Sequence, residues 1–415
     1  MGNLLKIAFR NLMRYKRRTI MTAILITIGI SAVILFSSIA GSFKNMMIGQ
    51  VTDSMLGHIQ VHNKGYMASI DNLPLNRILK PGQVKKVTQL LDSDPAVEAY
   101  SLRVKFGSGF SNFAETTNIR MNAVDPEAEA RTCPLLPGRL LDAKPGSKFM
   151  EKGKILVPQL LARGMKVKVG DSVALFATNR DGSVNGNSFE VGGILESVTG
   201  PGGRDGYMHI DDARALLRME SPEVSEIAVR VRDFSDLDAV KQRLQSALAD
   251  QVNPKGTPIF EIHDWEKLSP FSNIAGMIDM LMLFVNIMLV AIVLVSVLNV
   301  MIMAVYERVK EIGTISAMGV KPRKIMFLFV IEGFLLGLIG TLIGVAISVV
   351  AVSVMNFVKI TFDFGRQKGL VLERSINLRN LVLTGLLVIV ISILASLQPA
   401  WKASKMEPVD ALRHV

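Results

Sequence analysis

Four long runs of apolar residues constrain the fold of this chain more than any other feature. They cover residues 19–40, 280–305, 325–358 and 381–397, and Glu332 interrupts the third run. A helix rises about 1.5 Å per residue, so about 20 apolar residues cross the hydrocarbon core of a bilayer. We therefore predict an α-helical membrane protein with four transmembrane helices. Buried core helices of a soluble protein are the alternative, and three such runs in the last third of the chain disfavour it.

The first apolar run follows a strongly basic N-terminus. Residues 1–18 carry six cations and no acidic residue, interleaved with apolar residues. This pattern predicts a cytoplasmic amphipathic helix on the membrane surface. A cleaved signal peptide is the alternative, since Ser38-Ile39-Ala40 resembles a small-x-small cleavage site. Because the run is longer than the roughly 7–15 apolar residues of a signal peptide, we predict a retained span over 19–40.

The placement of charge predicts the orientation. The net charge of +11 could indicate nucleic-acid binding. The cations cluster beside the apolar runs, however, which is typical of cytoplasmic anchoring, so we expect no nucleic-acid partner. The first span usually dominates topology, and it predicts an inner (cytoplasmic) membrane protein with both termini in the cytoplasm. Residues 306–324 and the tail, 398–415, are then inside, whereas the loop 359–380 is outside despite holding as many cations as the inner loop.

Residues 41–279 are long enough for a folded domain between the first and second spans. Alternating and helical spacings are mixed there, so we predict a large α+β extracytoplasmic domain inserted between helices 1 and 2. The acidic pair Asp211-Asp212 suits the N-cap of one helix. The expected strands include 58–62, 189–191 and 227–231, and the expected helices include 83–91, 211–219 and 237–248.

The sequence contains no catalytic motif that we can identify. It has no GxxxxGK[ST] phosphate loop, no HExxH and no GxSxG, so we expect no enzyme activity, no cofactor and no metal in this chain. His58 and His62 share one face of an expected strand, but a third ligand is not evident. We therefore expect solvated strand histidines. Cys133, the only cysteine, cannot form an internal disulfide.

The inner loop, residues 306–324, is longer and more charged than a simple connector needs. Its mixture of charged and apolar side chains predicts a short helix, which Gly319 ends and Pro322 keeps from continuing. Such an element on the cytoplasmic side suits docking against a soluble partner. An ordinary connector between two spans is the alternative.

The third span carries a stripe of glycines. Small residues at this spacing share one helix face and let neighbouring helices approach closely, so we predict a helix-packing face. A carboxylate within the span, Glu332, should face protein or water rather than lipid. We expect it to pair with a cation of the N-terminal helix, and a proton-coupling role is the alternative. In the second span, Asn299, Asn286 and Ser296 are expected to hydrogen-bond across helices. The glycines are Gly333, Gly337, Gly340 and Gly344.

Several motifs together resemble one family. Glu307-Arg308, Glu311-Ile312-Gly313 and Ala317-Met318-Gly319 are similar to the signature of the FtsX/MacB/LolC–LolE class of ABC permeases. The segments 8–12, 399–403 and 408–413 resemble its N-terminal and C-terminal motifs, and 156–162 with 169–171 resembles a segment of its outer domain. Residues 57–62 look most like the lipoprotein-releasing branch.

The resemblance implies the organisation of a larger machine. Two permease chains, identical or homologous, would join two cytoplasmic ABC ATPase subunits, which would hold the ATP and Mg²⁺. Residues 280–410 would form an FtsX-like permease domain, and 41–279 a MacB-like periplasmic domain that handles cargo. The inner loop would be the coupling helix, with charged side chains orienting the ATPase and Ile312 and Ile315 adding apolar area. Its coupling residues would be Glu307, Arg308, Glu311, Ile312, Gly313, Ala317 and Gly319.

The implied function is lipoprotein release from the inner membrane, with lipidated cargo passed to a periplasmic carrier. A helix from residue 272 to the inner loop would be a stiff rod about 50 Å long, suited to mechanotransmission. The alternatives are an exporter permease for peptides, antibiotics or toxins, a non-transporting regulator of cell-wall hydrolysis, and a sensor with an outer ligand domain. The sequence shows neither a fused ATPase nor a cytoplasmic signalling domain, and this mildly disfavours the sensor.

Overall fold

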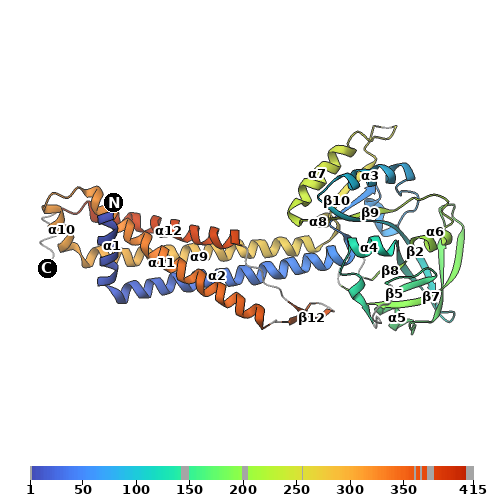
Figure 1. The fold of residues 1–415 in the computed structure, drawn as a ribbon, viewed down its shortest axis with the longest axis horizontal. Coiled ribbons are helices and arrows are strands. Elements are labelled where there is room, and N and C mark those ends of the chain that lie inside the picture. The colour runs from blue at the N-terminus through green and yellow to red at the C-terminus, as the bar shows by residue number, and fades with distance from the viewer. Residues whose placement is uncertain are drawn as a thin grey trace. The chain divides into compact units, whose positions relative to one another are not determined.

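The computed structural model describes residues 2–141, 149–198, 204–254, 256–358, 361–364, 367–371 and 378–407. The chain divides into two compact units. The helical unit comprises Met1–Asn45, Gly276–Phe362 and Gly369–Val415, and the α+β unit comprises Met46–Ala275 and Asp363–Lys368. Figure 1 shows the elements of each unit.

The described part of the helical unit contains four long helices and two short ones. Four helices are long and apolar enough to cross a membrane, and they lie over Thr19–Leu56, Phe271–Glu307, Pro322–Phe357 and Leu378–Ser404. Three of the apolar runs in the sequence each fall within one of them, and the third run, 325–358, extends one residue past the end of its helix at Phe357. The helices are α1 (Gly2–Arg14), α2 (Lys16–Val51), α9 (Phe271–Glu307), α10 (Val309–Ala317), α11 (Pro322–Phe357) and α12 (Leu378–Ser404).

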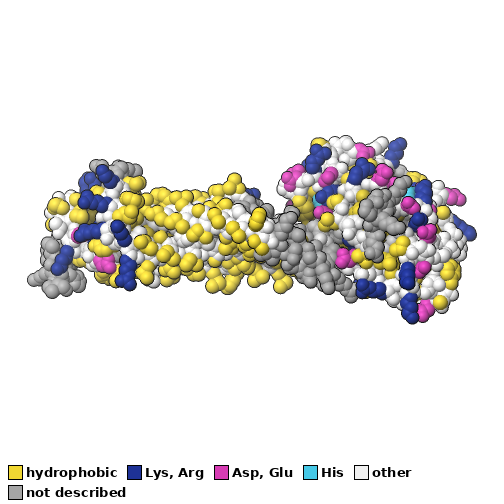
Figure 2. Space-filling view, turned by 60° about the horizontal axis from the view of Figure 1, so that its bottom comes forward, with side chains coloured by type: hydrophobic (Ala, Val, Ile, Leu, Met, Phe, Trp, Pro, Cys, Tyr) yellow, Lys and Arg dark blue, Asp and Glu magenta, His cyan; other side chains and the backbone are white. Residues whose placement is uncertain are grey.

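The surface of this unit separates apolar from charged side chains. Hydrophobic side chains cover the long helices, whereas Lys and Arg side chains gather at the end that holds α10 (Figure 2). The first turn of α11 begins with a proline, Pro322, and Gly319 just before it has φ +82°. A proline fits the first turn of a helix because its missing N–H has no intrahelical acceptor there, and a glycine adopts positive φ without strain. The turn between α10 and α11 therefore forms where the sequence predicts it.

The expected outer loop, 359–380, contains regular structure. Strands β11 (Thr361–Phe364) and β12 (Gln367–Val371) pair in a two-stranded sheet, and α12 begins at Leu378. Residues 359–360, 365–366 and 372–377 lie outside the described residues, as does the last part of the tail, 408–415.

In the α+β unit, the strands that the structure describes between residues 59 and 264 form one ten-stranded sheet. The hydrogen-bonded order is β10-β1-β9-β2-β3-β8-β5-β7-β4, and β6 joins β2 to β7. The strands β2, β3, β8, β5, β7 and β6 therefore close into a ring, and β10, β1 and β9 extend from it as an open sheet. The strands are β1 (Ile59–Asn63), β2 (Val97–Ser111), β3 (Thr116–Val124), β4 (Leu140–Leu141), β5 (Lys154–Pro158), β6 (Ser172–Thr178), β7 (Val184–Leu195), β8 (Gly206–His209), β9 (Glu226–Val231) and β10 (Phe260–Asp264).

The longest strand, β2, connects the ring with the open sheet. Its first half pairs antiparallel with β9, and its second half pairs with β3 and β6. One hydrophobic core serves both parts, because inward residues of β2 such as Val104, Phe106 and Phe110 are all buried in it. The short helices of the unit include α3 (Pro81–Ser93), α4 (Pro126–Thr132), α5 (Gln159–Gly164), α6 (Ile210–Leu216), α7 (Leu237–Leu248) and α8 (Trp265–Leu268).

Two details of the expected α+β domain need correction. Helix α6 ends at Leu216 rather than near 219, and its N-cap is His209, whose side chain accepts a hydrogen bond from the Asp211 amide. The acidic pair follows the cap instead of forming it. His58, just before β1, and His62 within it are buried and not solvated. Alternation in the sequence indicates a half-exposed strand, but residues on both faces of β1 are buried here, Ile59 and Val61 on one and Gln60 and His62 on the other.

Candidate functional site

The short helix α10 is held at the end of α9 by one arginine. Arg308 leaves the helical conformation (φ −115°, ψ 18°), and its backbone amide donates to the Val305 carbonyl. Its own carbonyl accepts from the Ile312 amide, so α10 starts immediately after the break. The chain therefore bends at Arg308 without losing its backbone hydrogen bonds.

The Arg308 side chain turns inward and pairs with the third long helix. Its Nη1 lies 2.9 Å from Oε1 of Glu332, and the two side chains are only 6% and 3% exposed. The guanidinium also lies over the Phe329 ring, with its carbon 5.4 Å from the centroid. Asn11 of α1 donates to the same Glu332 oxygen at 2.8 Å. We name the set Arg308, Glu332 and Asn11 the clasp, because it joins α1, α10 and α11.

The clasp corrects the expected partner of Glu332. The cation comes from Arg308, and the N-terminal helix contributes the neutral amide of Asn11. The reason is geometric, since the bend after α9 places Arg308 against α11. Burial alone lowers the pKa of Arg308, but the Glu332 and Glu311 carboxylates outweigh it and raise that pKa above its ordinary value.

A second ion pair, which is exposed, lies beside the clasp. Glu311 on α10 accepts from Arg308 Nε at 3.1 Å and from Arg14 Nη1 at 2.8 Å. Arg14 is the last residue of α1, so the final turn of this helix contacts α11 through Asn11 and α10 through Arg14. The Arg14–Glu311 pair is exposed and contributes little by itself. Because Glu311 contacts both Arg14 and Arg308, this pair links α10 to α1 next to the buried pair.

The structure divides the predicted coupling residues between two faces of α10. Arg308, Ile312 and Gly313 are buried, and Ile312 belongs to the core between the long helices. The expectation that Arg308 and Ile312 face the ATPase is therefore wrong, because both are already engaged within the bundle; Ile315 is half-buried against the same core. The exposed face holds Glu307, Lys310, Thr314, Ala317, Met318 and Gly319.

The four glycines of α11 contact two different helices. A Cβ on Gly333 would lie 2.5 Å from Ser396 Cβ, and one on Gly337 would lie 2.6 Å from Ser392 Cβ, both on α12. The next pair faces α2, where a Cβ on Gly340 would lie 2.6 Å from Ile26 Cγ2. Gly344 likewise approaches Ile30 of α2. The stripe therefore winds from one neighbour to the other.

Hydroxyl groups reinforce the close contact with α2. Thr27 Oγ1 donates to the Gly340 carbonyl at 3.3 Å, and Ser31 Oγ donates to the Gly344 carbonyl at 3.1 Å. Such bonds between helices require the backbone approach that glycine allows. The asparagines of α9 differ from expectation, since Asn286 bonds the Met282 carbonyl of its own helix and Asn299 is exposed on the surface of the unit.

A cluster of buried charges in the α+β unit was not anticipated. Arg103 of β2 makes two hydrogen bonds with Glu129, at 3.0 and 2.7 Å, and a third with Glu226 at 3.0 Å. Lys105 Nζ lies 2.9 Å from the same Glu226, and His62 Nε2 lies 3.5 Å from it. The only signal in the sequence is that Arg103 and Lys105, two residues apart, share a strand face.

These contacts perturb the carboxylate strongly. Burial raises the pKa of Glu226, but Lys105, His62 and Arg103 outweigh burial, so the pKa falls well below its usual range. Cys133 lies beside the cluster, with Sγ 3.1 Å from Arg103 Nη2, and burial raises the pKa of its thiol to about 12. A thiol in this state is structural rather than reactive. Among the described residues, no group of three or more His, Cys, Asp or Glu could hold a metal ion.

Comparison with protein families assigns the chain. The MacB-like periplasmic core domain matches residues 19–247, and the FtsX-like permease C-terminal domain matches residues 283–408. The chain belongs to the MacB/FtsX family of ABC transporter permeases. The FtsX-like match identifies it as a permease.

Curated relatives of this permease include LolC and MacB proteins. The lipoprotein-releasing system transmembrane protein LolC of Xylella fastidiosa (strain Temecula1 / ATCC 700964) is 25% identical, covering 71% of this chain and 72% of that protein. LolC of Neisseria meningitidis serogroup B is 23% identical and covers 94% and 92%. The macrolide export ATP-binding/permease protein MacB of Salmonella choleraesuis is 24% identical, with 96% of this chain but 58% of that protein covered.

The solved periplasmic region of MacB from Actinobacillus actinomycetemcomitans aligns with half of this permease. The alignment covers 50% of this chain and 90% of that structure, at 12% identity and a TM-score of 0.33. The family assignment does not depend on it.

Proposed function

We propose that this permease crosses the inner membrane four times with both termini in the cytoplasm and couples a cytoplasmic ABC ATPase to its extracytoplasmic domain. The gathering of Lys and Arg at the α10 end supports this orientation, since cytoplasmic segments are enriched in cations. Lys310, Lys321, Arg323 and Lys324 are all exposed there.

The clasp is the observation that carries the coupling role. It fixes α10 to α1 and α11 through a buried ion pair, so a force on the exposed face of α10 reaches the long helices directly. Helix α9, which ends at this point, runs unbroken from Phe271 to Glu307. Its length is about 55 Å at about 1.5 Å per residue, which suits a rod that transmits movement.

The cargo that we propose is a lipoprotein, released from the inner membrane and passed to a periplasmic carrier. Two observations favour this class: the LolC of Neisseria meningitidis matches over 94% of this chain and 92% of its own, and the names of the LolC relatives describe lipoprotein release. A second permease chain would complete the machine. Export of a macrolide or similar compound is the second candidate, because a MacB relative matches 96% of this chain.

The docking proposal is tested with the exposed face of α10. Met318 is 70% exposed, so Met318→Asp should leave the fold intact and reduce recovery of the co-expressed ATPase on the purified permease. Lys310→Glu should act in the same direction, and Met318→Leu is the matched control that keeps apolar area. Full ATPase recovery with both charged variants would mean that α10 only connects α9 to α11 and does not bind the ATPase.

The cargo proposal needs a separate measurement. The permease and its ATPase, reconstituted in vesicles that carry an acylated lipoprotein, should release this cargo on ATP addition when a carrier is present. Efflux of a macrolide without lipoprotein release would favour the exporter instead. Arg308→Ala, which breaks the clasp, should uncouple ATP turnover from either form of transport.

A further inference from the structure

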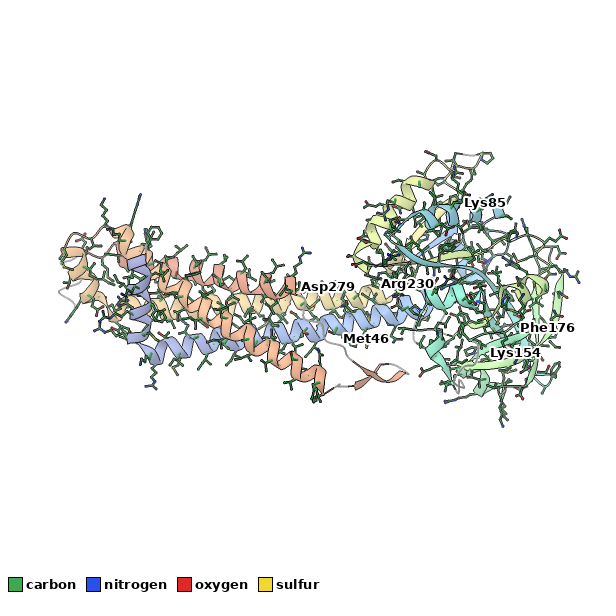
Figure 3. All side chains as sticks on the ribbon, in the orientation of Figure 1. Met46, Lys85, Lys154, Phe176, Arg230 and Asp279 are labelled. Atoms are coloured by element: carbon green, nitrogen blue, oxygen red, sulfur yellow. The ribbon has the colours of Figure 1, made fainter. Side chains whose placement is uncertain are left out.

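The helical unit contains a polar cavity of about 290 Å³ at the end opposite α10. Residues of α2, α9 and α12 line it, including Ser38, Ser42, Lys44, Asp279 and Thr384. Lys44 lies 28 residues beyond the start of α2, and Asp279 lies 28 residues before the end of α9. At about 1.5 Å per residue these distances are about 42 Å, which is more than the hydrocarbon thickness. Figure 3 labels Asp279 on α9.

The cavity has one charge of each sign at its rim. Lys44 Nζ lies 2.7 Å from Oδ1 and 2.6 Å from Oδ2 of Asp279. Both side chains remain partly exposed, so each can exchange its partner for a ligand of the opposite charge. A ligand that carries both an anion and a cation would replace one ion pair with two and leave no charge unpaired.

Two hydroxyl groups in the wall lack partners. Ser38 Oγ and Ser42 Oγ are buried, and neither has a hydrogen-bond partner among the described residues. Ser42 is only 5% exposed. Other serine hydroxyls in the long helices have partners: Ser348 and Ser392 bond their own backbone, and Ser31 bonds the Gly344 carbonyl of α11. An unpartnered buried hydroxyl is unfavourable, and rotation about χ1 would turn it toward a ligand in the cavity.

We propose that this cavity binds the phosphoethanolamine headgroup of a phospholipid. Lys44 and the two serine hydroxyls would contact the phosphate, and the Asp279 carboxylate would accept from the primary ammonium. An anionic headgroup without an amine would face Asp279 unfavourably, and a choline headgroup has no N–H to donate. The site therefore selects ethanolamine over both. This inference goes beyond cargo coupling and shares with the proposed function only the membrane placement.

The test is lipid titration of the full-length permease, purified in mild detergent and stripped of lipid, followed by native mass spectrometry. Phosphatidylethanolamine, phosphatidylglycerol and phosphatidylcholine with identical acyl chains are compared. One charge-assisted hydrogen bond corresponds to about tenfold in affinity, so we expect about tenfold preference for phosphatidylethanolamine at one site. Equal binding of the three lipids by the parent would overturn the proposal.

Four variants locate the site. Ser42→Leu fills the cavity and should abolish the preference, whereas Ser353→Leu, at an exposed serine of α11, should retain it. Lys44→Gln should weaken the binding of all three lipids through their phosphate. Asp279→Asn should make the affinity for phosphatidylethanolamine equal to that for phosphatidylcholine. Because Lys44 and Asp279 are partly exposed, these two variants remain informative if Ser42→Leu misfolds.

Two further outcomes would contradict the assignment. A preference that survives both charge variants would place the lipid elsewhere. Competition by soluble phosphoethanolamine at the concentration of the lipid would make a soluble compound, not a bilayer lipid, the ligand. ATPase recovery on the parent and on the four variants should be equal, because the cavity lies at the end of the helical unit opposite α10, so the lipid proposal and the docking proposal can fail separately.

Discussion

Arg308 and Glu332 lie 24 positions apart in the sequence, and their side chains meet at 2.9 Å where almost no solvent reaches them. The pair is the hydrophilic centre of an otherwise apolar contact between α10 and the long helices. Removing one member of a buried pair leaves a desolvated charge behind, which is far more unfavourable than never having had the pair.

Arg308→Ala should therefore destabilise the permease by about 3–5 kcal/mol, as unpaired buried charges do. The double variant Arg308→Met with Glu332→Leu should recover most of this loss, because it removes both charges and keeps apolar volume. Denaturant unfolding in detergent micelles measures the difference. A single variant as stable as the parent would show that the pair is hydrated and weak.

Gly337→Ala should loosen the contact between α11 and α12. The added Cβ would lie 2.6 Å from Ser392 Cβ, so one helix must move, at a cost of about 1–3 kcal/mol. Gly276→Ala on α9 is the matched control, since a Cβ there meets nothing within 4 Å. Adding Ser392→Gly to Gly337→Ala should restore the contact. Thermal unfolding and purification yield are compared for the parent, the two single variants and the double variant. Equal values for Gly337→Ala and Gly276→Ala would argue against tight packing of α11 on α12.

The proposed orientation predicts where single cysteines can be labelled. Ala317→Cys, on the exposed face of α10, should react with a membrane-impermeant maleimide only after cells are permeabilised. Val184→Cys, on the exposed part of β7, should react in intact cells. Native Cys133 is fully buried and gives no background in the folded protein. Labelling of Ala317→Cys in intact cells would invert the topology.

Acid should destabilise the α+β unit through Glu226. Its pKa in the folded protein lies well below the roughly 4.3 of an unfolded glutamate, so its stabilisation is complete above about pH 5 and is lost as pH falls through and below 4. Glu226→Gln should lower stability at neutral pH by about 3–5 kcal/mol and flatten the acid dependence.

The fluorescence of buried Trp265, in a Trp401→Phe background, reports this unit selectively. Glu115→Gln, at an exposed glutamate, is the control and should leave the neutral-pH stability unchanged within about 0.5 kcal/mol. An unchanged acid midpoint for Glu226→Gln would mean that Glu129 alone balances Arg103.

The long helices could be predicted because the spans, the turn before α11 and the packing face each correspond to a local pattern in the sequence. Runs of apolar residues gave the four long helices, and Gly319 with Pro322 gave the turn before α11. The glycine stripe was visible too, but not that Gly333 and Gly340 contact different neighbours. Which helix lies beside which is decided by tertiary packing, and spacing along one helix carries no information about it.

For the candidate site, the sequence predicts which segment is involved but not which of its side chains are exposed. Charge marked 306–324 as unusual, yet Arg308 and Ile312 were assigned to a partner because a sequence does not show which side of a short helix is covered. The buried cluster around Glu226 was missed for a related reason. Its members come from β1, β2, α4 and β9, and each charged residue alone looks like an ordinary surface position.

The ring of strands in the α+β unit restricts how another polypeptide can attach to it. Among the pairings that the described residues make, each ring strand has a neighbour on both sides, and only β10 and the two-residue β4 end a row. A cargo or carrier that adds itself as an extra strand would therefore join at β10, or at a part of a ring strand with one paired edge, such as Thr116–Arg120 of β3, whose described pairing with β8 begins only at Met121. Where both edges of a ring strand are paired, recognition must proceed through side chains, and a bound polypeptide can then leave without breaking a series of backbone hydrogen bonds.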